Sequence, residues 1–116
     1  MIWVRIGSVA MALAVMLGAF GAHGLKSRLS ADLMEIYKTG VLYHLIHALG
    51  LILVGILCLS KPGRYEATGI LLCVGIVLFS GSLYVLAVSG IRWMGAITPL
   101  GGVSFIAAWI LLAKSS

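Results

Sequence analysis

Four long apolar runs follow one another along this chain, and only short breaks that carry charged residues separate them. The runs cover about residues 6–24, 39–60, 67–89 and 95–113. A helix needs about 20 predominantly apolar residues to cross the hydrocarbon core of a bilayer, and each run has about that length. The sequence therefore predicts an all-α integral membrane protein, a single four-helix transmembrane bundle with short loops that occupies residues 1–116.

The composition indicates that the chain is surrounded by lipid and not by water. Of its 116 residues, 62% are hydrophobic and only 9% are charged, whereas a soluble domain carries about 25% charged residues. A soluble fold of this size could not bury so much apolar surface, because small folds leave much of their surface wet. The net charge of +5 comes from basic residues placed one or two at a time between the runs. We therefore expect a lipid bilayer around the chain and no nucleic-acid partner.

The segment between the first two runs, residues 25–38, has a mixed composition. Leu29, Leu33 and Ile36 recur there at helical spacing, and Ser30 can cap a helix that begins after it. This pattern predicts an amphipathic interfacial segment that leads into the second helix, with a plain helical linker as the alternative.

Orientation follows from the number of helices and from the basic residues at each end. Four helices place both termini on one side of the membrane. The count of Lys plus Arg is tied, with Arg5, Lys61, Arg64 and Lys114 on the side of the termini and Lys26, Arg28, Lys38 and Arg92 on the other. The excess of basic residues that marks a cytoplasmic side is therefore missing. The N-terminal amine tips the prediction toward cytoplasmic termini.

The first apolar run carries a small residue at every fourth position, at Ala10, Ala14, Gly18 and Ala22. Small residues at this spacing let the backbones of two membrane helices approach closely. The sequence thus predicts that the first helix is a central packing element.

The polar residues of the four runs gather toward the side opposite the termini. A proline that bends or starts a helix lies on the same side. The full set is His23, Tyr43, His44, His47, Ser80, Ser82, Tyr84, Thr98 and Pro99. Polar groups are costly in lipid, so they usually face one another inside a bundle. We predict that these residues line a shared polar cavity that opens toward this side.

Several uses of such a cluster stay open at this point. The histidines can simply hydrogen-bond serine and tyrosine across helices, ligate haem, hold a quinone, or carry protons in a small transporter. A metal site of His23, His44 and His47 would lack a nearby carboxylate or thiolate. No nucleophile motif indicates an enzyme, and we predict no catalytic residue.

Four stretches in order carry a resemblance to a known family. They are Gly18-Ala-Phe-Gly-Ala-His-Gly-Leu25, Tyr37-Lys-Thr-Gly-Val-Leu-Tyr-His-Leu-Ile-His-Ala48, Phe79-Ser-Gly-Ser-Leu-Tyr84 and Gly95-Ala-Ile-Thr-Pro-Leu-Gly-Gly102. Together they resemble the family called domain of unknown function 423, whose eukaryotic relatives are known as transmembrane protein 256. The resemblance implies a small four-helix protein of the bacterial inner membrane, and it implies no particular activity. We expect an accessory or interaction subunit of a membrane complex, or a homo-oligomer. The alternatives are a small ligand-binding or transport protein and a redox subunit that binds haem or quinone.

Overall fold

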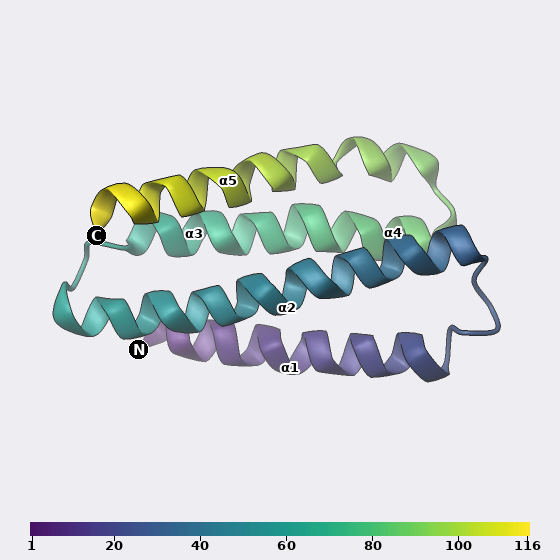
Figure 1. Cartoon of the computed structure of the whole chain (residues 1–116), viewed down its shortest axis with the longest axis horizontal. Helices are drawn as coiled ribbons and strands as arrows, with labels where there is room; N and C mark the ends of the chain where they lie inside the picture. Colours follow the sequence, from purple (N-terminus) through teal and green to yellow (C-terminus); the bar gives the residue numbers. More distant parts are fainter.

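Helices and short loops make up the whole chain (Figure 1). The computed structural model describes all 116 residues. Four helical rods each have the length and the apolar composition needed to cross a membrane, which confirms the predicted fold class. In chain order the elements are α1 (Ile2–His23), α2 (Ala31–Ser60), α3 (Glu66–Gly75), η1 (Ile76–Ser80), α4 (Gly81–Ser89), η2 (Arg92–Ala96) and α5 (Thr98–Ser115).

The second rod, α2, is longer than its apolar run. It begins at Ala31, well before residue 39, because the hydroxyl oxygen of Ser30 accepts the Leu33 N–H at 3.2 Å and caps the helix. The amphipathic segment expected before the second helix is therefore the first part of α2 itself, and the loop covers only residues 24–30. At about 1.5 Å per residue α2 is roughly 45 Å long. Its first turns extend past the end of α1 (Figure 1).

The third rod contains a π-helical turn. It joins α3, η1 and α4, and within it the N–H of Gly81 bonds to the carbonyl of Ile76, five residues earlier. The Phe79 backbone in this turn lies against α5, where a Cβ on Gly101 would be 2.3 Å from the Phe79 nitrogen. Such turns are rare and frequently occur at functional sites. Here the turn lies at the point where the backbones of the third rod and α5 come closest to each other at Gly101.

The four rods form a flattened row in which α2, not α1, holds a central place. The order across the row is α1, α2, the third rod and α5 (Figure 1), and the Cα extents are 47 × 26 × 16 Å. α1 packs along α2, and α5 packs along the third rod. The expectation that the first helix is central is therefore wrong, because its neighbours lie almost entirely on one side of it.

The seam between α1 and α2 depends on glycines in both helices. A Cβ on Gly7 would lie 2.8 Å from the backbone nitrogen of Ile52, and a Cβ on Gly55 would lie 2.7 Å from that of Val4. Each helix thus places bare backbone against the backbone of the other, as small residues do in membrane helix pairs.

The small residues that face α2 recur every seventh position, at Gly7, Ala14 and Gly21, all of which are buried. Of the four small residues predicted to form the seam, Ala14 is buried, Ala10 and Gly18 are half-buried, and Ala22 is exposed. A step of four residues turns about 40° too far for a helix of 3.6 residues per turn, whereas a step of seven drifts by only ∼20°. The four-residue stripe therefore rotates away from α2 by Ala22.

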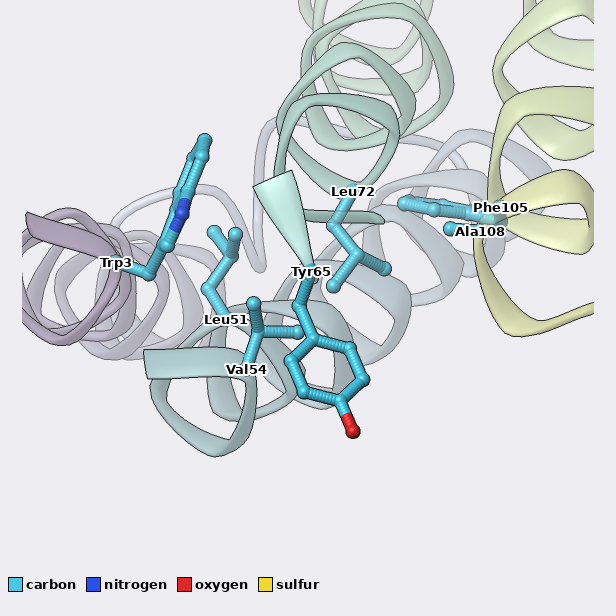
Figure 2. Packing of buried hydrophobic residues seen from close by; sticks show 7 residues of the cluster. All are labelled: Trp3, Leu51, Val54, Tyr65, Leu72, Phe105 and Ala108. Atoms are coloured by element: carbon cyan, nitrogen blue, oxygen red, sulfur yellow. The ribbon is translucent and has the colours of Figure 1, made fainter. Parts of the chain in front are cut away.

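Most of the apolar core lies toward the termini. Side chains from α1, α2, α3, the residue before α3 and α5 meet there (Figure 2), and the buried cluster comprises Trp3, Leu51, Val54, Tyr65, Leu72, Phe105 and Ala108. A smaller cluster of Leu25, Tyr37 and Ala87 lies near the other end. The histidines of α2 lie in the stretch between these two clusters.

Candidate functional site

His44 connects α2 to the helices on both sides of it. Its Nδ1 lies 2.8 Å from the Tyr84 hydroxyl of α4, and its ring also faces the backbone carbonyl of Ala10 on α1. The Tyr84 ring has room because residue 40 is glycine, where a Cβ would be 3.1 Å from that ring. His44 is buried at 5% exposure, so this histidine is enclosed by protein rather than open to a ligand.

The serine and threonine hydroxyls of the predicted cluster form further ties between neighbouring rods. Ser80 donates to the Gly40 carbonyl at 2.7 Å, which joins the π-helical turn to α2. Ser82 and Thr98 lie 2.6 Å apart and join α4 to α5. Because each of these groups has a partner within the bundle, none is left unpaired in the hydrocarbon.

His47 lies between α2 and α5 with both ring nitrogens engaged. Nδ1 lies 2.7 Å from the Tyr43 carbonyl, and Nε2 lies 3.0 Å from the Trp109 indole nitrogen. A carbonyl only accepts and an indole N–H only donates, so this network assigns the proton to Nδ1 and the accepting lone pair to Nε2. The imidazole also stacks on Phe105, with ring centroids 3.5 Å apart and planes at 11°.

The predicted cluster is thus divided into separate pairs, and two of its members lie apart from them. His23 is exposed in the last turn of α1, because two residues turn the helix about 200° away from Gly21, which faces α2. Pro99 is exposed in the first turn of α5. The N–H groups of a first turn have no partner within the helix, so a proline there removes no helix hydrogen bond. Tyr43 is 38% exposed. The structure encloses no common polar cavity among these residues.

The arrangement does not fit haem ligation by two histidines. His44 and His47 lie on the same helix, three residues apart, and His47 has no free ring nitrogen. No three His, Cys, Asp or Glu side chains come together in a metal-binding group. The two cysteines, Cys58 and Cys73, are both unpaired and half-buried.

A groove between α2 and α5 opens beside His47 on the lipid-facing surface. Its wider part has a volume of about 540 Å³, and its walls include Tyr43, His47, Phe79, Phe105 and Trp109. A second hollow of about 410 Å³ continues along α2 as far as Ile56 and shares Ile46 and Trp109 with the first.

The aromatic residues of α5 did not enter the predicted site. Phe105 and Trp109 are four residues apart and therefore share one face of their helix, which was the signal available in the sequence. Their position opposite His47, more than fifty residues away in the chain, is a property of the fold alone.

These features define a class, a small multi-pass membrane protein whose intramembrane polar groups join its own helices. The family model described as "Protein of unknown function (DUF423)" matches residues 17–102, and the chain belongs to this family, as the four stretches of sequence indicated.

Its relatives include three bacterial membrane proteins. The "UPF0382 membrane protein YwdK" of Bacillus subtilis is 50% identical over 99% of this chain and 95% of its own length. The "UPF0382 membrane protein SH2409" of Staphylococcus haemolyticus is 43% identical over 99% of this chain and 94% of its own. The corresponding protein SSP2132 of Staphylococcus saprophyticus is 44% identical over 96% and 92%. No solved structure matches the chain.

Proposed function

We propose that this protein is an accessory subunit of a complex in the bacterial inner membrane, and that a transmembrane helix of its partner lies in the groove between α2 and α5. The observation that carries the proposal is the length of this groove. Its walls run along α2 from Leu42 to Ile56, which is roughly 21 Å at about 1.5 Å per residue. Four turns of a second helix fit along it.

The walls of the groove suit a helix better than they suit lipid chains alone. Gly102 lines it without a side chain and leaves space for another backbone to approach. Tyr43 and Trp109 add rigid aromatic surface, and such side chains are enriched where proteins bind one another. The groove is open because α2 and α5 both pack on the third rod and leave one side of it uncovered.

The internal hydrogen bonds support a binding role over a chemical one. His44, His47, Ser80 and Ser82 are all bonded within the chain, so these four side chains serve to join the helices. The termini lie at the same end of the molecule (Figure 1), and the N-terminal amine favours the cytoplasmic side for that end.

The test is purification of the full chain from its native membrane in mild detergent, after cross-linking, with mass spectrometry of the proteins that accompany it. Ile46 lines both hollows and is exposed, so Ile46→Trp fills the groove without a change in the core. Ile70 on α3 is 54% exposed, against 47% for Ile46, and lines no hollow, so Ile70→Trp is the matched control. We expect a stoichiometric membrane partner that Ile46→Trp loses and Ile70→Trp keeps. Equal recovery with both variants, or no partner for the natural chain, would contradict the proposal.

A planar apolar ligand such as a quinone is the second candidate, for the wider part of the same groove. The rings of Tyr43 and His47 lie at 8°, and those of His47 and Phe105 at 11°, so three rings have nearly parallel planes beside the hollow. Its volume of about 540 Å³ lies within the usual range for small-molecule sites. Solvent extraction and an absorption spectrum of the same purified sample test it, since a bound quinone would be recovered in proportion to the chain.

A further inference from the structure

A second groove lies between α1 and α2 at the end of the molecule away from the termini. Its floor is apolar, its volume is about 260 Å³, and Gly18, Val41 and Leu45 contribute to it. A smaller hollow of about 240 Å³ adjoins it and contains Lys26. Both hollows share Gly21, Ala22, Met34 and Lys38, so they form one groove that passes from an apolar floor to a basic mouth.

The groove exists because α1 has almost no side chains on this part of its surface. Gly18 and Ala22 leave part of the α2 surface without cover from α1, whereas Gly21 packs directly against the Tyr37 ring. α2 also continues past the end of α1, so the mouth of the groove is not closed by a second helix (Figure 1). The Tyr37 hydroxyl donates to the Leu17 carbonyl at 2.5 Å and holds the two walls at a fixed spacing.

The mouth carries two positively charged side chains that form no ion pair within the chain. The side chains of Lys26 and Lys38 are both exposed, and neither makes an ion pair or a hydrogen bond within the protein. Lys38 directly precedes the apolar run that begins near residue 39, and Lys26 follows the end of α1 at His23. Both ammonium groups thus lie where the hydrocarbon gives way to the headgroup layer, the depth at which lysines meet lipid phosphates.

We infer that this groove binds a membrane phospholipid with a net negative headgroup. The phosphate lies between Lys26 and Lys38, and one acyl chain lies on the apolar floor beside Gly18 and Leu45. We expect the charge to select the headgroup, because two lysines without an ion-pair partner in the chain favour an anionic lipid over a zwitterionic one of the same chain length. Basic pockets between membrane helices bind anionic headgroups in this way.

The test is native mass spectrometry of the full chain in detergent, titrated with dioleoyl phosphatidylglycerol or dioleoyl phosphatidylcholine. We expect one phosphatidylglycerol molecule to be retained in preference to phosphatidylcholine. Removal of each lysine charge should weaken phosphatidylglycerol binding by about fivefold, so the Lys26→Gln and Lys38→Gln double variant should lose most of the preference. The matched control is the Lys61→Gln and Lys114→Gln double variant at the other end of the molecule, which should keep it.

A second pair of variants tests the apolar floor without a change in charge. Ala22 is exposed and lines both hollows, so Ala22→Phe should lower phosphatidylglycerol binding, whereas Ala19→Phe, at an exposed position outside them, should not. Glycerol phosphate without acyl chains should not compete; full competition would assign the site to free phosphate and overturn the lipid proposal. Equal binding of both lipids, or equal losses in test and control variants, would also overturn it. None of these outcomes depends on the groove between α2 and α5.

Discussion

The glycine contact between α1 and α2 gives a sharp prediction for the Gly7→Ala variant. A Cβ at this position would lie 2.8 Å from the Ile52 nitrogen and 2.9 Å from the Ala48 oxygen, whereas ordinary contacts begin at 3.4 Å. Both neighbours are backbone atoms in a helix and cannot rotate away. The two helices must therefore separate by about 0.6 Å, the difference between 2.8 and 3.4 Å, and overpacking of this kind costs about 1–3 kcal/mol.

Helix propensity acts in the opposite direction, because alanine is favoured over glycine by up to about 1 kcal/mol in a helix interior. Gly102→Ala on α5 is the matched control. The nearest atom to its Cβ would be 3.8 Å away, in the Phe79 ring, so this variant gains the propensity and meets no clash. The difference between the two variants isolates the overpacking, and we expect Gly7→Ala to be the less stable by about 1–3 kcal/mol.

The assay is reversible unfolding in mixed micelles by increasing SDS, followed by far-ultraviolet circular dichroism. Each variant gives a free energy of unfolding from the same titration, so the comparison does not depend on an absolute scale. Equal stability of the two variants, or a more stable Gly7→Ala, would refute the inference that backbone meets backbone at this seam.

Three further predictions concern the hydrogen bonds and the membrane. Trp109→Phe removes the donor to His47 and should lower the free energy of unfolding in the same SDS assay by about 0.6–1.7 kcal/mol more than Trp3→Phe does. Trp3 is the control because its buried indole N–H has no partner. Equal losses would mean that the bond to His47 contributes nothing. Tyr84→Phe removes the hydroxyl bonded to the first histidine of α2 and should lower stability by a similar amount, whereas Tyr65→Phe, whose hydroxyl makes no hydrogen bond within the chain, should not. Alkaline carbonate extraction should leave the chain in the membrane pellet, and its release into the supernatant would contradict the four transmembrane helices.

The four spans were predictable because hydropathy is a local property that accumulates over about 20 neighbouring residues. The start of α2 was harder to predict. The charged residues that follow Ser30 indicated a separate interfacial segment, whereas the Ser30 cap makes them the first turns of α2. The π-helical turn at residues 76–80 leaves no trace in the apolar pattern, because every residue from Gly75 to Phe79 is apolar or small.

The sequence predicted how deep the residues of the candidate site lie in the membrane, but it did not predict their hydrogen-bond partners. His44 and Tyr84 were both placed toward the end away from the termini, but the sequence could not show that they bond to each other. Trp109 was missed because its indole meets His47 only after two distant helices pack on the third rod. The α1–α2 groove was missed for a similar reason, since it comes from the small size of Gly18 and Ala22 once α1 lies beside α2.

The close pairing of α1 with α2 has a consequence for biogenesis. α1 finds nearly all of its neighbours on the next helix to be synthesised, so the first hairpin can assemble in the bilayer before residue 66 leaves the ribosome. The second hairpin, formed by the third rod and α5, then docks on the side of α2 that α1 leaves free. We expect a chain that ends at Ser60 to insert with both of its ends on one side, and glycosylation mapping of that truncated chain measures this directly.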